Sequence, residues 1–340
     1  MSSRYAKDQP AGFPNRIERV AIVGAGGQMG KHLTEHLLLT GKHVVTAITR
    51  PSSTSNLPDG VRVVHVDYSG DDNKDLVRAL QGQQVLLITM SVMAPGDTII
   101  KLVRAAAEAG VPYVLPNWYG HDATNDVLAR DSMLLESKDL LNAEIERLGV
   151  SSTLRLVCNF WYEFSLGGGP DRYGFDFQKR SFTIFDGGDV AINTSTWPQC
   201  GRAIASLLSL KELPDDESDT SPTLSQFGNN GLYISSFRVT QRDMFESVKR
   251  VTGTTDADWM ITHDSSQQRW KDGRAAVQEG NWKAFTKMLY SRMFFPTGDG
   301  DYQSRRGLHN DLLGLPVEDL DEATAVAIRM GDSGEVPFSH

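Results

Sequence analysis

The chain has 340 residues, a formal net charge of −9, 40% hydrophobic residues and 23% charged residues. At roughly 150 residues per domain, this length predicts about two domains, or one large α/β unit with a lobe attached, and the composition excludes a disordered chain. The acidic balance argues against a nucleic-acid partner or an anionic membrane surface. Two cysteines, Cys158 and Cys200, are too few for a disulfide scaffold or a multi-cysteine metal centre.

No segment resembles a targeting signal. Residues 1–16 are polar and lack the apolar stretch of a signal peptide, and the longest apolar run, around 85–93, is too short to span a membrane. We therefore expect a cytoplasmic protein with a flexible N-terminal tail over residues 1–17.

From residue 18 onward, apolar strands rich in β-branched residues alternate with helices. We predict strands at 20–23, 44–49, 62–66, 85–89, around 114–115 and at 153–157, and helices at 28–40, 75–80, 97–109 and 131–148. Continuous apolar strands between helices are typical of a parallel sheet that is covered on both faces. The sequence thus predicts a doubly wound α/β (Rossmann) domain over residues 18–158.

The regular alternation ends after residue 158. Glycine-rich turns separate the later segments, for which we predict a helix at 201–210, an acidic loop at 211–230, a strand at 231–239, a helix at 241–252 and an aromatic-rich helical stretch at 270–295. We expect a smaller, irregular α+β lobe over residues 159–330 that mainly binds the substrate, with some segments returning to the Rossmann domain. A C-terminal tail is expected over residues 331–340.

The turn after the first strand has glycines at Gly24, Gly27 and Gly30, in the spacing G-x-x-G-x-x-G. Glycine permits a tight turn and a close approach of phosphates, and the helix N-terminus that follows supplies free N–H groups. We predict that this turn, with Gln28 and Met29, binds the pyrophosphate of a dinucleotide. The alternative is a purely structural turn.

The residues after the second strand favour NADP(H) over NAD(H). An NAD site places an acidic residue about 20 residues beyond the glycines, yet residues 36–58 contain no Asp or Glu. Arg50 and Ser53 instead offer a guanidinium and a hydroxyl, which suit a 2′-phosphate. The alternative for Arg50 is a surface arginine in a loop.

The helix after the glycine turn also contains a metal-like pattern. His32 and His36 fit the zinc motif H-x-x-E-H. Because Gly30, Leu33 and Leu37 must face the sheet, the two histidines flank a buried stripe, and spacing nominates no third ligand. We expect no metal.

Other candidate site residues follow the carboxyl ends of the remaining strands, where ligands of doubly wound sheets bind. The further cofactor candidates are Asp67, Met90, Ser91, Asn117 and Asn159, and Val92 follows the same strand as Met90. The candidate walls of an aromatic substrate pocket are Trp118, Tyr119, Phe160, Trp161 and Tyr162. Core packing is the alternative for each of these aromatic residues.

None of the nine tyrosines has a lysine four positions later, so the Tyr-x-x-x-Lys dyad of common short-chain dehydrogenases is absent. The chain instead resembles the NmrA-like and isoflavone reductase-like branch of the atypical short-chain dehydrogenases, of a fungal type. The resemblance covers about residues 18–165. It is carried by the glycine turn, Arg50, the segment Gly110-Val111-Pro112-Tyr113-Val114-Leu115-Pro116-Asn117-Trp118-Tyr119-Gly120, and Lys138 on a helix that leads to Gly149-Val150. Asn117-Trp118-Tyr119 replaces the Ser-Glu-Phe of the family.

The resemblance implies an NADPH-dependent reductase of a small aromatic or alkaloid-like secondary metabolite. Hydride would pass to a C=C, C=N or C=O bond, with Lys138 beside the cofactor and in proton transfer; a solvated helix lysine is the alternative. A non-catalytic, NADP-sensing regulator of NmrA type is a second function that the resemblance implies. We expect a small-molecule substrate, no direct contact with nucleic acid, no membrane, and either a monomer or a homodimer.

Overall fold

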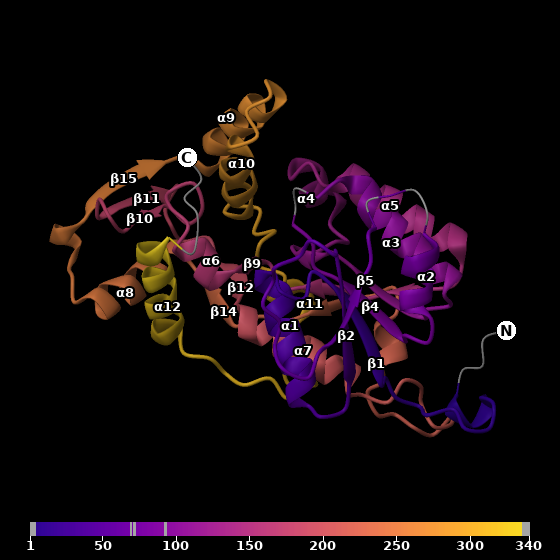
Figure 1. Ribbon diagram of the computed structural model, residues 1–340. Helices are drawn as coiled ribbons and strands as arrows, with labels where there is room; N and C mark the ends of the chain where they lie inside the picture. The colour runs from indigo at the N-terminus through magenta and orange to yellow at the C-terminus, as the bar shows by residue number, and fades with distance from the viewer. Residues whose placement is uncertain (1–4, 69, 71–72, 92–93, 335–340) are drawn as a thin grey trace.

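The computed structural model describes residues 5–68, 70, 73–91 and 94–334. A six-stranded parallel sheet with the strand order β3-β2-β1-β4-β5-β7 dominates the first half of the chain (Figure 1). The strands are β1 (Arg19–Val23), β2 (Val44–Thr49), β3 (Arg62–His65), β4 (Val85–Ile88), β5 (Tyr113–Pro116) and β7 (Ser152–Thr153). This order and the parallel pairing confirm the predicted doubly wound fold.

Helices cover both faces of the sheet. On one face, α1 (Gln28–Leu39) packs along α7 (Trp197–Leu208), and on the other lie α2 (Lys74–Leu80), α3 (Gly96–Glu108) and α5 (Leu135–Leu148). Successive side chains of a strand point to opposite faces, so Val20 and Ile22 of β1 join one core while Ala21 and Val23 join the other. Burial on both faces explains why these strands are continuously apolar in the sequence.

The helix predicted over 131–148 is α5, which begins four residues later than predicted. A short helix, α4 (Asp126–Asp131), is separated from α5 by a break at residues 132–134, where Met133 has φ 59°. The prediction was wrong here because the apolar pattern does not reveal a single residue in the left-handed region.

The strand predicted over 153–157 is also divided. Its first part, β7, pairs with β5, whereas β8 (Arg155–Val157) pairs with β6 (Tyr119–Gly120) and β13 (Gly231–Tyr233) in a second small sheet. Asn117, with φ 54°, turns the chain between β5 and β6, so the partners on that side are divided as well.

The second lobe has its own aromatic core, surrounded by short sheets and helices. Its strands are β9 (Phe160–Trp161), β12 (Ile192–Ser195) and β14 (Phe237–Val239) in one sheet, and β10 (Phe175–Asp176), β11 (Ser181–Phe185) and β15 (Met260–Asp264) in another. Its helices are α6 (Tyr162–Leu166), α8 (Gln241–Thr252), α9 (Ser266–Gln278), α10 (Ala284–Met293), α11 (Gln303–Arg306) and α12 (Leu320–Ser333). Three short 3₁₀ helices are η1 (Ala6–Asp8), η2 (Leu224–Phe227) and η3 (Asp256–Asp258).

Several predictions for this half need correction. The strand predicted over 231–239 is two strands, β13 and β14, in different sheets, and the helical stretch predicted over 270–295 is the pair α9 and α10. The helix predicted at 201–210 begins earlier, at Trp197, because the Thr196 side chain accepts the Gln199 N–H and caps it. Two late segments lie against the first half of the chain, since α7 packs on α1 and β13 pairs with β8.

The described part of the N-terminal segment contacts the loop that follows α7. The backbone N–H groups of Ala6 and Lys7 donate to the carbonyls of Pro214 and Asp215, at 2.8 and 3.2 Å.

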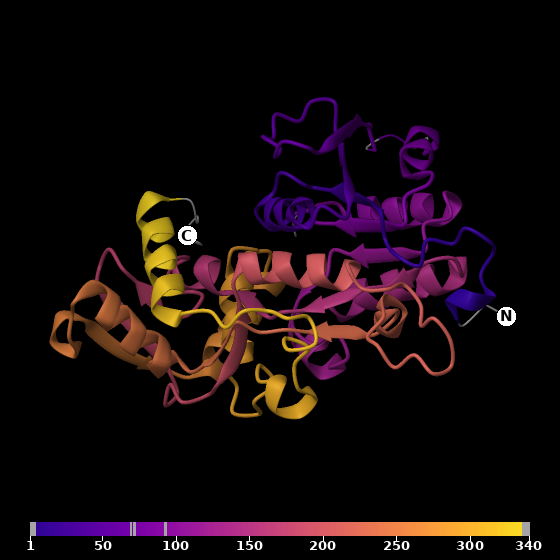
Figure 2. The ribbon, with the colours of Figure 1, turned by 90° about the horizontal axis from the view of Figure 1, so that it is seen from below.

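At the C-terminal end, α12 continues to Ser333, so the tail predicted from residue 331 begins inside a helix; residues 335–340 lie outside the described residues. Both ribbon views place α12 at the end of the molecule remote from η1 (Figures 1 and 2). No helix of the described chain is long and apolar enough to cross a bilayer.

Candidate functional site

The glycine turn joins β1 to α1 and leaves no room for side chains. Gly24 has φ 87°, and a Cβ built on it would lie 2.4 Å from the Thr89 carbonyl oxygen; a Cβ on Gly30 would lie 2.1 Å from the Gly24 carbonyl oxygen. Gly27, the N-cap of α1, supplies no side-chain hydrogen bond to the helix. The first N–H groups of α1 are therefore left for an anion, which fits the pyrophosphate of a dinucleotide.

This turn lies where ligands of doubly wound sheets bind. β1 has β2 on one side and β4 on the other, so the strand order reverses beside Gly24. Thr89, directly after β4, donates a hydrogen bond from its hydroxyl to the Val23 carbonyl at 3.0 Å, which links the ends of β4 and β1. Met90 is half-buried and Ser91 is exposed next to it, while Val92 lies outside the described residues.

The loop after β2 borders the glycine turn. The Arg50 side chain is exposed, and its carbonyl accepts the Ser53 N–H at 2.9 Å. A Cβ built on Gly26 would lie 2.5 Å from the Ser55 Cβ, so this loop touches the turn. Burial raises the pKa of Tyr68 while the nearby charge of Arg50 lowers it, which places Arg50 near the end of β3, where Asp67 also lies.

The segment after β5 forms an aromatic corner. The Trp118 indole N–H donates to the His121 carbonyl at 3.0 Å, and the Trp118 ring meets the imidazole edge to face, with centroids 5.2 Å apart. Burial raises the pKa of Tyr119 well above its ordinary value, and its hydroxyl has no hydrogen-bond partner among the described residues. Both residues are half-buried, as a pocket wall requires.

Lys138 is not a solvated helix lysine. Its side chain is only 9% exposed, and its Nζ lies 2.6 Å from Asp126 Oδ1 and 3.4 Å from Asp139 Oδ1. The ammonium also donates to the Ala123 carbonyl at 3.2 Å, so it sits against the loop that follows β6. Its hydrogen bond to Asp126 lowers the pKa of that carboxyl.

His121 is a site residue that the sequence prediction missed. Burial lowers the pKa of its imidazole to about 4, the charges of Arg292 and Lys138 act in the same direction, and only Asp122 opposes them. The ring is neutral at pH 7, and its Nε2 has no hydrogen-bond partner in the described part of the chain. Its place directly after the Trp118-Tyr119-Gly120 segment was the one signal that the sequence offered.

The residues after β8 divide between the site and the core. Asn159 donates from Nδ2 to the Asn193 carbonyl at 2.8 Å, and its Oδ1 has no partner among the described residues. Phe160 is half-buried and stacks on Tyr290 at 3.8 Å. Tyr162 is fully buried and hydrogen-bonded to Thr324 at 2.7 Å, so it is a core residue of the second lobe and not the predicted pocket wall.

The two histidines of the H-x-x-E-H pattern lie at the contact between α1 and α7. The His32 ring stacks on Trp197, with centroids 6.0 Å apart, and the His36 ring would be 2.4 Å from a Cβ built on Gly201. Burial lowers the pKa of both imidazoles. Within the described ranges, no group of three or more His, Cys, Asp or Glu side chains is arranged to hold a metal ion.

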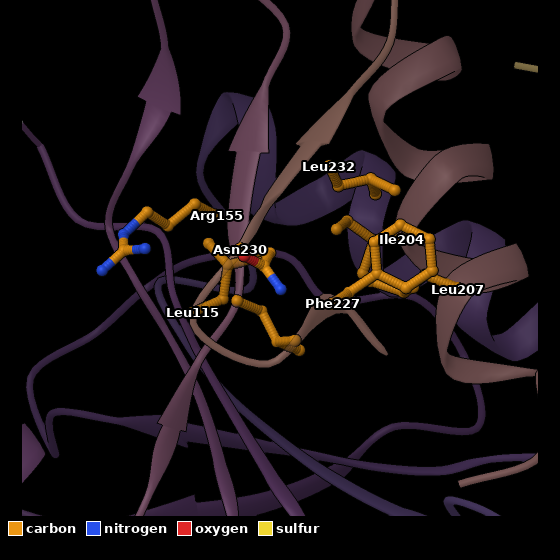
Figure 3. Close-up of a pocket in the computed structure, with 8 residues that line it drawn as sticks. Leu115, Arg155, Ile204, Leu207, Phe227, Asn230 and Leu232 are labelled. Carbon is orange, nitrogen blue, oxygen red and sulfur yellow. The ribbon is translucent and has the colours of Figure 1, made fainter. Parts of the chain in front are cut away.

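A narrow hollow under α7 is lined by none of the candidate cofactor or substrate residues (Figure 3). Ile204, Leu207, Phe227 and Leu232 gather beside the helix, and the Arg155 guanidinium points away from them. These four apolar residues belong to the core between the sheet and α7, so the hollow is a feature of core packing.

Comparison with known proteins agrees with this geometry. Residues 17–166 match the model of the NmrA-like family. The resemblance to the NmrA-like family is confirmed. "Oxidoreductase aprR" of Aspergillus flavus is 24% identical over 316 residues, which cover 92% of this chain and 99% of the relative. "Phenylcoumaran benzylic ether reductase TP7" of Nicotiana tabacum is 31% identical over 156 residues, or 42% of this chain and 48% of the relative.

Solved structures share the fold of this chain. A structure described as isoflavone reductase has a TM-score of 0.68 at 19% identity. The match covers 91% of this chain and 98% of the isoflavone reductase chain. The binary complex of leucoanthocyanidin reductase from Vitis vinifera with NADPH has a TM-score of 0.68 at 16% identity and covers 92% of this chain and 99% of its own. The relatives agree with the expected NADP(H)-dependent oxidoreductase, and the structural matches establish the shared fold.

Proposed function

We propose that this NmrA-like chain is an NADPH-dependent reductase of a small aromatic or alkaloid-like molecule. The proposal rests on a glycine turn without room for side chains at the start of α1 and on a buried lysine in the first turn of α5. Because α1 and α5 come after β1 and β5 of one parallel sheet, we infer that both features lie at its carboxyl edge. The similar proteins named oxidoreductases and reductases support it. Residues 18–158 would bind the cofactor and residues 159–330 would mainly bind the substrate, in a cytoplasmic protein that is a monomer or a homodimer.

The residues present fit the cofactor. NADPH, when bound, supplies the hydride for a C=C, C=N or C=O bond. The pyrophosphate is assigned to the glycine turn and the α1 N-terminus, and the 2′-phosphate to Arg50 and Ser53. The remaining cofactor contacts are assigned to Gln28, Met29, Asp67, Met90, Ser91, Asn117, Lys138 and Asn159.

Lys138 is the proposed proton donor. A substrate atom that accepts hydride leaves negative charge on its neighbour, and a positioned acid stabilises that charge by giving up a proton. The ammonium of Lys138 is desolvated yet linked to Asp126, whose side chain is 64% exposed. This link offers a route by which Lys138 regains its proton from solvent. Neutral His121 borders the same loop and adds no competing charge.

The aromatic residues at this edge suit a flat substrate. Trp118, Tyr119, Phe160 and Trp161 are each half-buried, so each is available to form a pocket wall. Their carboxyl-edge position after β5 and β8 supports the assignment of the pocket to the space above the sheet.

A non-catalytic NADP sensor is the second candidate. The match to the NmrA-like family favours it, as does the Asn117-Trp118-Tyr119 segment. The buried Lys138 counts against it, because a sensor needs no proton donor. Oxidation of bound NADPH by an added aromatic acceptor distinguishes an enzyme from a sensor.

Cofactor titration of the full chain tests the proposal. Isothermal titration with NADPH and with NADH should give micromolar affinity for NADPH and a preference of about tenfold or more, the scale of one charge-assisted contact. Equal affinity for the two cofactors, or binding of neither, contradicts the proposed function.

A further inference from the structure

Four rings meet where the second lobe touches α1 and α7. The centroids of Trp161, Phe164 and Trp197 lie 5.7 to 5.8 Å from one another, and His32 stacks on Trp197 at 6.0 Å. We call these four residues the aromatic cluster. His32 belongs to the turn of α1 that directly follows the glycine cradle, so the cluster borders the proposed cofactor site.

Glu163 lies between two residues of this cluster in the sequence and is only 4% exposed. Its Oε1 accepts the backbone N–H of Trp197 at 3.2 Å, whereas its Oε2 is buried without a hydrogen-bond partner in the described structure. Burial raises the pKa of this carboxyl to about 7, and the charge of Glu318 acts in the same direction. A buried acceptor without a donor is destabilising, so Oε2 is an atom that an added donor would satisfy.

The carboxylate of Glu318, whose charge acts on Glu163, has several hydrogen-bond and ion-pair partners, unlike that of Glu163. Glu318 pairs with Arg202 and accepts hydrogen bonds from the hydroxyls of Thr196 and Ser236. Glu163 has no such set. The α7 N-terminus is therefore already served by Thr196 and by Glu163 Oε1, and Oε2 is left over.

The aromatic cluster also contains two buried hydrogen-bond donors. The indole nitrogens of Trp161 and Trp197 are buried donors, and neither has an acceptor among the residues that the structure describes. Trp161 and Phe164 are half-buried, so their rings link the carboxyl to the surface. A group of aromatic rings with two unpaired donors, adjoining a carboxyl with one unpaired acceptor, complements an aromatic molecule with its own polar hydrogen.

We propose that Glu163 is a specificity-determining residue that accepts a hydrogen bond, at Oε2, from an N–H or O–H group of a flat aromatic ligand lying against Trp161 and Phe164. The inference deepens the proposed function, because that ligand is the hydride acceptor of the reductase. Because Oε2 is buried in the structure, this binding mode requires the half-buried rings of Trp161 and Phe164 to move aside when the ligand binds.

A matched pair of probes tests this proposal. 2-Naphthol and 2-methoxynaphthalene share one ring system, and only the first has an O–H donor. Isothermal titration of the full chain, above the pKa of Glu163, should show about tenfold tighter binding of 2-naphthol, the scale of a hydrogen bond to a charged group. Equal binding of the two probes, or binding of neither, overturns the proposal without any variant.

Glu163→Gln should abolish the preference for 2-naphthol. The amide oxygen takes over the Trp197 N–H, and an NH₂ donor then stands where Oε2 was. Glu318→Gln is the matched control and should keep the preference, and both variants should bind NADPH as the unmodified chain does. A Glu163→Gln chain that still prefers 2-naphthol contradicts the proposal. Loss of NADPH binding in the unmodified chain would instead count against the proposed function, and the naphthalene comparison does not depend on it.

Discussion

Lys138 combines burial with charge in a way that suits an acid. The ammonium is shielded by α5 and by the loop after β6, and it pairs with two carboxylates. A second lysine of this chain, Lys249 on α8, is likewise held between two carboxylates, Glu246 and Asp256, but it lies in the second lobe. The two lysines have similar partners and differ in their place in the fold, so Lys249 is a matched control for the proposed role of Lys138.

Lys138→Ala should lower turnover by about 10²–10⁴-fold, the usual contribution of one general acid. The fold should remain intact, and NADPH affinity should fall far less than turnover because the other cofactor contacts remain. Lys138→Arg should restore little, because a guanidinium does not release its proton near neutral pH. The measurement is NADPH oxidation with an acceptor that the unmodified chain reduces, and Lys249→Ala is the control. Near-full turnover of Lys138→Ala would show that the proton comes from elsewhere.

The buried carboxyl of Glu163 predicts a pH dependence of stability. Its pKa is raised from 4.5 to about 7, so the folded chain holds a proton that the unfolded chain has already released. The free energy of unfolding should therefore fall as pH rises from about 4.5 to above 7, by about 3 kcal/mol from this group. Urea unfolding at several pH values should show a flatter dependence for Glu163→Gln. An unchanged pH dependence in that variant contradicts the assignment.

At the scale of elements, the start of α1 depends on the absence of side chains. Gly30→Ala places a Cβ against the backbone carbonyl of Gly24, which cannot move aside as the end of a flexible side chain could. The turn must then move, and NADPH binding should be lost. Gly41→Ala, beyond the C-terminal end of the same helix, meets nothing within 4 Å and should cost only about 1 kcal/mol of stability from its φ of 66°. Normal NADPH affinity in Gly30→Ala would contradict the cradle.

The strands of the first domain could be predicted from the sequence because burial on both faces makes them apolar throughout. β12 shows why others could not. All four of its residues are buried although three are polar, and Asn193 is satisfied by Ser235 and Gln303, far along the chain. No local pattern indicates such partners, and β11, β15 and α12 were also missed.

The candidate site divides in the same way. The glycine turn and Arg50 could be found locally because one strand, one turn and one helix create their environment. The environments of His121 and Glu163 come from distant residues, since burial by the folded chain is the main cause that lowers the pKa of the first and raises that of the second, and Arg292 and Glu318 add to these shifts. Only the folded chain brings these charges together.

At the scale of the whole molecule, Arg292 ties the two lobes together. Its guanidinium is 2% exposed, with Nε 2.7 Å from Asp131 of α4 and Nη2 2.8 Å from Asp299. Arg292→Met leaves two carboxylates without their buried partner and should cost about 3–5 kcal/mol. Arg250→Met, which breaks an exposed pair with Asp321, is the control and should cost about 0–1 kcal/mol. Urea unfolding measures both, and equal effects would show that Arg292 does not hold the lobes.

The central claim is that this chain binds NADPH by reading the 2′-phosphate beside the glycine turn. The most direct test is to titrate Arg50→Ala and the unmodified chain with NADPH and with NADH. The affinity for NADPH should fall by about 1–3 kcal/mol, the contribution of one charge-assisted hydrogen-bond group. The affinity for NADH, which lacks the 2′-phosphate, should stay the same. An equal loss for both cofactors, or no loss for NADPH, would contradict the claim.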